Sequence, residues 1–177
     1  MKHTLIYLPK RKTLTVTAEL LLKIFEKTDD FFFCLNYPSL TKHMSARAAR
    51  QYLEYKWHGV PHPINLLNKK GYIEIKKLND QILVKITSNG KIIAQQLRIS
   101  LIRKPLPEGQ ILIVAFDIPE RAKGARTVFR RSLKRMGFKQ IQKSIWATSF
   151  CVIKEMNDLI ESLCIKKWVK LFKSIAI

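Results

Sequence analysis

The chain has 177 residues, and 47% of them are apolar, so it can fill a core and is not a disordered basic tail. It carries 33 Lys and Arg against 13 Asp and Glu, a formal net charge of +20. Residues 1–104 hold 19 basic and 7 acidic side chains (+12), and residues 105–177 hold 14 and 6 (+8). Because such a field repels itself unless a polyanion neutralises it, we expect nucleic acid as the partner.

Cysteine usage and hydropathy indicate the compartment. Cys34, Cys151 and Cys164 form no close pair, which is typical of reduced thiols, and each lies among apolar residues where we expect it to be packed. No stretch approaches the roughly 20 apolar residues of a membrane span. The first apolar run is too short for a signal peptide. We therefore expect a cytoplasmic protein with no membrane partner.

Three helices are predicted in the N-terminal part. "TAELLLKIFEKT" (17–28) has apolar residues at helical spacing, with Thr17 as its expected N-cap. "SARAARQYLEYKW" (45–57) repeats the same periodicity behind Ser45. "INLLNKKG" (64–71) reads as a short helix that Gly71 ends.

A hairpin and a further helix follow. Two alternating runs, Tyr72–Lys76 and Ile82–Ile86, flank the turn formers Asn79 and Asp80. "SNGKIIAQQLRISLI" (88–102) then returns to helical periodicity. Helices, a hairpin and a closing helix are typical of a winged helix-turn-helix, which we assign to residues 1–100. Either residues 45–57 or residues 63–70 form its recognition helix.

A second domain is predicted after the Pro-rich and Gly-containing stretch "LIRKPLPEG" (101–109), which we interpret as a linker. Beyond it come a buried strand, a helix over 121–136 ended by Gly137, two strands, a helix and a last strand. On the first helix, an apolar face is expected from Ala122, Ala125, Val128, Phe129, Leu133 and Met136. The order βαββαβ predicts a ferredoxin-like domain over 110–177 and an α+β protein overall.

Three blocks of this second domain carry a family resemblance. "VAFDIPE", "RRSLKRMGF" and "IQKSIW" resemble the C-terminal half of the PaaX family of repressors. That half is itself similar to the small CRISPR adaptation protein that partners the integrase. The resemblance implies a homodimer that binds operator DNA through paired winged helices, and it leaves the small-molecule effector open.

Asp117, at the end of the first strand of this domain, has two interpretations. The resemblance to the CRISPR protein implies a divalent metal ligand in phosphodiester cleavage, because the matching acid has that role there. The residues themselves favour a helix cap, since Asp117 and Glu120 have capping-box spacing around Pro119. We therefore expect a cap at Asp117, no catalysis and no cofactor, with Mg²⁺ as the metal of the alternative.

Basic residues in both domains are candidates for contact with double-stranded DNA. In the second domain they recur at steps of three and four, which predicts one helix face opposite the core. The candidates are Arg47, Arg50, Lys69, Lys70, Lys76, Lys77, Lys123, Arg126, Arg130 and Lys134.

The sequence thus predicts a DNA-binding transcriptional regulator, a repressor acting as a homodimer. One alternative is a metal-dependent nuclease or CRISPR adaptation subunit that carries a winged helix. Another is a general RNA-binding or chromosome-associated protein without sequence preference.

Overall fold

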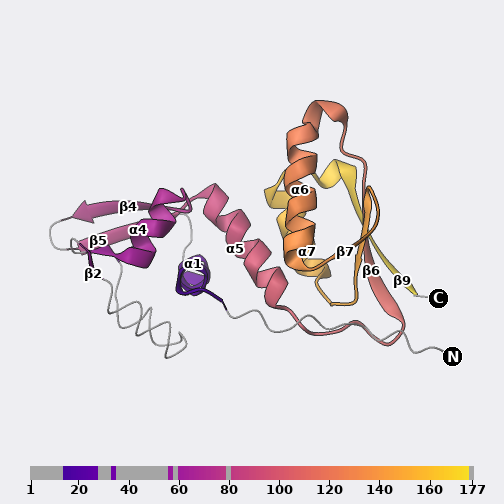
Figure 1. Cartoon of the computed structure of the whole chain (residues 1–177), viewed down its shortest axis with the longest axis horizontal. Coiled ribbons are helices and arrows are strands. Elements are labelled where there is room, and N and C mark those ends of the chain that lie inside the picture. Colours follow the sequence, from indigo (N-terminus) through magenta and orange to yellow (C-terminus); the bar gives the residue numbers. More distant parts are fainter. Residues whose placement is uncertain (1–13, 28–32, 35–55, 58–59, 79–80, 176–177) are drawn as a thin grey trace.

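The protein packs its side chains into two hydrophobic cores, one in each half of the chain (Figure 1). The computed structural model describes residues 14–27, 33–34, 56–57, 60–78 and 81–175. Helices and strands contribute to both halves, which confirms the predicted α+β class. None of the helices within these ranges has the length and apolar character needed to cross a membrane.

The first helix, α1 (Val16–Lys27), begins before its predicted cap. Thr15 Oγ1 accepts a hydrogen bond from the Ala18 amide at 3.3 Å, so Thr15 is the capping residue. The prediction of Thr17 was wrong because Thr17 already lies in the first helical turn. The fully buried face of α1 consists of Leu20, Leu21 and Ile24.

The helix α4 (His62–Lys69) packs against α1 and ends as predicted. Its fully buried core side chains include Ile64 and Leu67, three residues apart on one face. Gly71 has a φ of +67°, in the left-handed region that favours glycine, and its amide donates to Asn68 O at 2.8 Å. The chain therefore leaves α4 directly into a strand.

The predicted hairpin is confirmed. Strand β4 (Ile73–Leu78) pairs antiparallel with β5 (Gln81–Ile86), and Leu78 lies opposite Gln81. The turn residues 79–80 lie outside the described part. A two-residue strand, β1 (Phe33–Cys34), pairs with the other edge of β5 and completes a sheet of order β1-β5-β4.

The helix predicted over residues 45–57 lies outside the described residues except at its end. Strand β2 (Lys56–Trp57) pairs there with β3 (Val60–Pro61), so the prediction of helix up to Trp57 was wrong. A proline disfavours helical backbone in the residue before it, which explains the extended conformation of Val60.

The helix α5 (Ser88–Leu101) begins at a tightly fixed N-cap. Thr87 Oγ1 accepts from the Gly90 amide at 3.0 Å and donates its own hydrogen to Gly71 O at 2.7 Å. Because Gly71 ends α4, this one hydroxyl joins the end of α4 to the start of α5.

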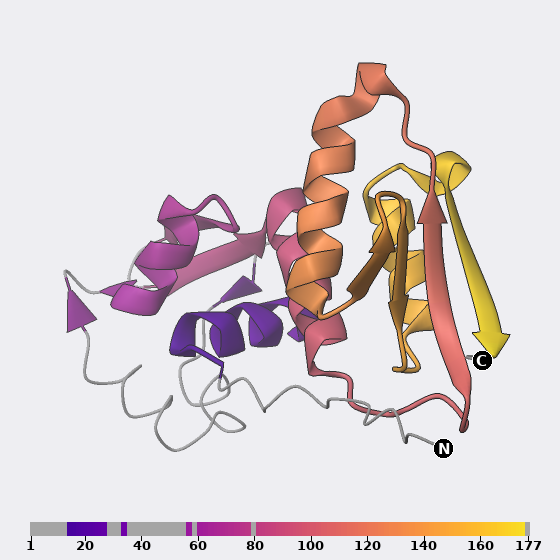
Figure 2. The same cartoon turned by 45° about the vertical axis from the view of Figure 1, so that its right-hand side comes forward.

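Along its length, α5 contributes to both cores, and Figures 1 and 2 show it between α1 and α6. Ala94 belongs to the N-terminal core and Ile99 to the C-terminal one. Between them, Gln96 Nε2 donates to Ser132 Oγ at 2.9 Å in a buried hydrogen bond. The domain boundary that the sequence predicts at residues 101–109 stays a prediction. Helix α5 packs against both halves of the chain and so couples them.

The C-terminal sheet has the order β7-β8-β6-β9, and every pairing in it is antiparallel. Its helices, α6 and α7, lie on the same side of the sheet (Figure 1). This arrangement is ferredoxin-like, as the βαββαβ order predicted. The elements are β6 (Gln110–Phe116), α6 (Lys123–Met136), β7 (Lys139–Gln142), β8 (Ile145–Thr148), α7 (Ile153–Ser162) and β9 (Val169–Ile175).

The core of this domain centres on Phe129 of α6, which is fully buried and meets the Phe116 ring edge-to-face at 5.2 Å. Gly137, with a φ of +89°, ends α6 as predicted. The predicted apolar face was wrong for Ala125 and Val128, which are exposed.

Ser132 is buried in this core although it is polar. Its hydroxyl donates to Val128 O at 2.9 Å and accepts from Gln96, so its polar atoms are satisfied.

The cysteines are only partly as predicted. Cys151 is half-buried, while Cys164 is exposed just after α7, at a φ of +54°. The expectation of a packed apolar site was wrong for Cys164, because the helix ends before it.

Candidate nucleic-acid interface

Two of the four cations predicted on the outer face of α6 are instead held against the domain. Arg126 is paired with Glu120, and its side chain is 24% exposed. The Arg130 guanidinium lies over the Phe116 ring, 5.8 Å from its centroid. The prediction that all four cations face away from the core was therefore wrong for Arg126 and Arg130.

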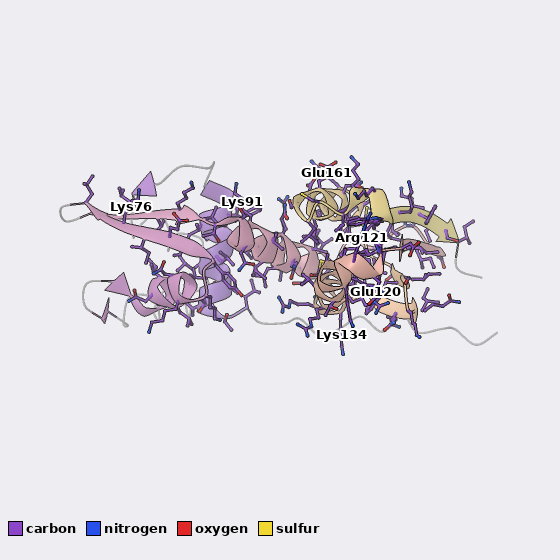
Figure 3. The ribbon with its side chains drawn as sticks, turned by 90° about the horizontal axis from the view of Figure 1, so that it is seen from above. Lys76, Lys91, Glu120, Arg121, Lys134 and Glu161 are labelled. Carbon is purple, nitrogen blue, oxygen red and sulfur yellow. The ribbon has the colours of Figure 1, made fainter. Side chains whose placement is uncertain are left out.

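Lys123 and Lys134 do lie on the surface of α6. Lys123 Nζ is 3.9 Å from Glu120 in an exposed ion pair, which contributes little to stability. Lys134 makes no ion pair with another described residue, and Figure 3 shows its side chain pointing outward. Of the predicted α6 contacts, Lys134 is the one that is both exposed and unpaired within the described part.

The N-terminal candidates lie at the end of α4 and in the hairpin. Lys69 is the last residue of α4, Lys70 follows it, and both are exposed. Lys76 is exposed on β4, opposite Leu83, and Lys77 is the next residue of that strand. Arg47 and Arg50 lie outside the described residues.

Asp117 does not cap a helix. A 3₁₀ turn (Glu120–Ala122) with Pro119 as its N-cap precedes α6, and neither the turn nor α6 has a side-chain capping bond. The capping prediction was wrong because the chain does not turn into helix at Asp117: its amide donates to Trp168 O at 2.9 Å, in line with the β6–β9 pairing.

The exposed Asp117 side chain lines an open cleft of about 440 Å³ at the end of β6. The other lining residues come from β6, the β7–β8 turn, the start of β8, the 3₁₀ turn Lys166–Trp168 and β9: Ala115, Phe116, Ser144, Ile145, Lys167, Trp168, Lys170 and Phe172. Lys167 Nζ lies 4.5 Å from the centre of the Trp168 ring. The cleft thus combines one carboxylate with lysine ammonium groups and aromatic rings.

This donor set does not fit a magnesium site within one chain. Mg²⁺ is held by carboxylates and other oxygen ligands, and two lysines line the same cleft. The nearest acid in sequence, Glu120, is engaged by Arg126. No group of three or more His, Cys, Asp or Glu side chains suited to a metal occurs among the residues that the structure describes.

Asp117→Asn is therefore expected to change the free energy of unfolding by less than about 0.5 kcal/mol, the usual range for a surface substitution. Thr87→Ala is the matched control, because it removes an observed cap and is expected to cost about 0.5–2 kcal/mol. Urea unfolding of both variants measures the difference. An equal loss in the two would show that Asp117 does stabilise the start of α6.

The C-terminal domain matches a known protein family. Its antiparallel sheet with two helices on one side defines a ferredoxin-like domain. Residues 107–176 match the PaaX protein central Cas2-like domain, which covers this whole sheet and both helices. This match bears out the resemblance to PaaX proteins, and the C-terminal part of the chain is similar to their Cas2-like domain. No curated protein matches the chain significantly.

Proposed function

We propose that the protein is a cytoplasmic transcriptional regulator, a repressor that binds double-stranded DNA as a homodimer. The observation that carries the proposal is the PaaX-type Cas2-like domain, since PaaX proteins are regulators. The net charge of +20 supports a polyanionic partner.

The N-terminal half supports the DNA-binding part of the proposal. Helix α4 leads straight into the β4–β5 hairpin, and α1 and α5 pack beside them in one core. In a winged helix-turn-helix, the recognition helix precedes the wing. We infer that α4 is the recognition helix, that Lys69 and Lys70 at its end contact DNA, and that Lys76 and Lys77 contact the flanking backbone.

The C-terminal sheet supports the dimer. Its helices cover one face, and on the other face β6 presents Ile111, Ile113 and Ala115, all partly exposed. The edge strand β9 exposes 52% of Phe172 and 73% of Ile175. Apolar side chains beside an unpaired strand edge favour association with a second copy.

A titration of a fluorescent duplex at two salt concentrations tests the DNA proposal. Each phosphate contact contributes about 0.9 to the slope of log affinity against log salt. Four contacts therefore predict an affinity about 150-fold weaker at 200 mM than at 50 mM salt. Absence of binding at low salt, or affinity independent of salt, would contradict the proposal.

The homodimer is tested by light scattering on the full chain at micromolar concentration. We expect a dimer mass for the wild type and a monomer mass for Phe172→Asp, because the new charge would lie within the apolar interface. Val128→Asp is the control, since Val128 is 48% exposed on α6 and should leave the dimer intact. A monomeric wild type would overturn the dimer.

The nuclease alternative is less well supported, because the Asp117 cleft holds lysines in place of further carboxylates. Incubation of DNA and RNA with the wild type and Mg²⁺ distinguishes the two functions. Cleavage that disappears in a folded Asp117→Asn variant would favour the nuclease.

A further inference from the structure

The segment from the start of α6 to the β7–β8 turn has an unusual charge distribution. Residues 121–143 contain no acidic residue and nine cations: Arg121, Lys123, Arg126, Arg130, Arg131, Lys134, Arg135, Lys139 and Lys143. A basic helix usually carries acids at i+3 or i+4 that pair with its cations. The cations of this segment must therefore find partners elsewhere or remain available.

Four of these cations interact with other groups of the protein, and a fifth lies at the start of the segment. Arg126 and Lys123 interact with Glu120, and Arg130 lies over Phe116. Arg135 donates to Gln96 Oε1 at 3.3 Å, on the side of α6 that faces α5. Arg121 belongs to the 3₁₀ turn before the helix.

The remaining four cations form what we call the basic edge: Arg131, Lys134, Lys139 and Lys143. All four are exposed, and none makes an ion pair or a side-chain hydrogen bond with another residue in the described ranges.

The fold brings these four together along one border of the domain. Arg131 and Lys134 are three residues apart on α6 and are therefore neighbours on its surface. Strand β7, which carries Lys139, is the outer strand of the sheet, and all four of its residues are exposed. Arg130 and the Phe116 ring link α6 to the β7–β8 turn, because the Phe116 amide donates to Ser144 O, next to Lys143.

The neighbouring helix shows that this charge is local. Helix α7 covers the same side of the sheet and contains Glu155, Asp158 and Glu161 with one cation, Lys154. A general requirement for solubility does not explain why one helix collects the acids and the other the cations. A polyanion that contacts the α6 border of the domain, and not α7, does explain it.

One member of the basic edge, Lys134, can be placed relative to α4. Figure 3 shows Lys134 and α4 on one side of the molecule. Helix α5, of 14 residues, joins the two halves and spans about 20 Å, or roughly six base pairs of duplex. A straight duplex that contacts α4 can therefore continue toward α6.

We propose that the basic edge is a second DNA-contacting surface, which holds the phosphate backbone of the duplex beyond the segment contacted by α4. Lysine and arginine side chains that contact phosphates carry no sequence information, so this surface adds affinity without sequence preference. The proposal rests on the proposed DNA-binding function and assigns to the Cas2-like domain a direct part in it.

The test compares two quadruple variants of the full chain that remove the same charge. The edge variant is Arg131→Gln, Lys134→Gln, Lys139→Gln and Lys143→Gln. The control variant is Lys104→Gln, Lys154→Gln, Lys166→Gln and Lys167→Gln, four exposed lysines outside the edge and outside strand β9. A pair variant, Arg131→Gln with Lys134→Gln, gives a milder change, and thermal unfolding checks that all three fold.

For a duplex of about 30 base pairs, the edge variant is expected to bind at least about tenfold more weakly than the control, whatever the sequence. Its salt slope should fall by about 0.9 for each phosphate that the variant no longer neutralises. If both quadruple variants weaken binding equally, net charge alone is responsible and the basic edge is not a site.

Other outcomes separate this inference from the proposed function. Edge-variant affinity equal to that of the wild type overturns the inference and leaves the regulator proposal intact. A wild type that binds no duplex at low salt overturns both. Unchanged DNA affinity together with abolished binding to vesicles of anionic lipid assigns the edge to a membrane surface and also overturns it.

Discussion

Gly90→Ala is expected to lower the free energy of unfolding by about 3 kcal/mol, at the upper end of the range for overpacking. A Cβ at Gly90 would lie 2.0 Å from the Tyr72 carbonyl oxygen and 2.9 Å from Ile86 Cγ1. The Tyr72 carbonyl cannot simply move, because it accepts the Thr87 amide at 3.0 Å. Chemical denaturation followed by circular dichroism measures the destabilisation.

Gly124→Ala is the matched control for this glycine. Gly124 lies in the first turn of α6, and a Cβ there would meet nothing within 4 Å. The substitution is therefore expected to stabilise the protein by about 0.5–1 kcal/mol through helix propensity and a less flexible unfolded chain. If Gly90→Ala behaved like Gly124→Ala, the close approach between α5 and the hairpin would be wrong.

Phe129→Ala is expected to cost about 3–5 kcal/mol, the range for removal of a buried aromatic side chain. Phe129 is fully buried, and the substitution would also remove the edge-to-face interaction with Phe116 and the packing around it. Equilibrium unfolding in urea gives the value.

Val128→Ala, one position away, is the comparison for Phe129→Ala. Val128 is 48% exposed, so its truncation is expected to change stability by no more than about 0.5 kcal/mol. Similar destabilisation of the two variants would contradict the orientation of α6 described above.

Local pattern was enough to predict the elements of the C-terminal domain. The apolar run "QILIVAF" predicted β6 and Gly137 predicted the end of α6, because a short apolar run after turn formers and a left-handed helix cap each have a local signature. The ferredoxin-like order then followed from the sequence of elements.

Long-range packing explains what the sequence did not predict. Helical spacing places Arg130 with Lys134, but the Phe116 ring that holds Arg130 belongs to another element. Similarly, the spacing of Asp117 and Glu120 resembles a capping box. In the structure, however, Ile118 between them is buried, with 2% of its surface exposed, and the chain makes a 3₁₀ turn before α6. Both outcomes depend on how α6 and the turn before it pack against the sheet, which local sequence does not show.

The wrong N-cap prediction for α1 has an identifiable cause. Thr15 and Thr17 are both plausible caps, and the choice depends on where the first buried residue, Leu20, must lie against its core. The choice of recognition helix stayed open in the sequence because residues 45–57 are the longer and more basic stretch, whereas residues 63–70 directly precede the hairpin.

The central claim, that the N-terminal half binds duplex DNA through α4, is tested most directly by Lys69→Gln with Lys70→Gln. This pair is expected to weaken duplex binding at least about tenfold and to lower the salt slope by about 1–2. The control pair, Lys154→Gln with Lys166→Gln, removes the same charge from the C-terminal domain and should bind like the wild type. Equal affinity of the α4 pair and the wild type, in folded protein at low salt, would contradict the claim.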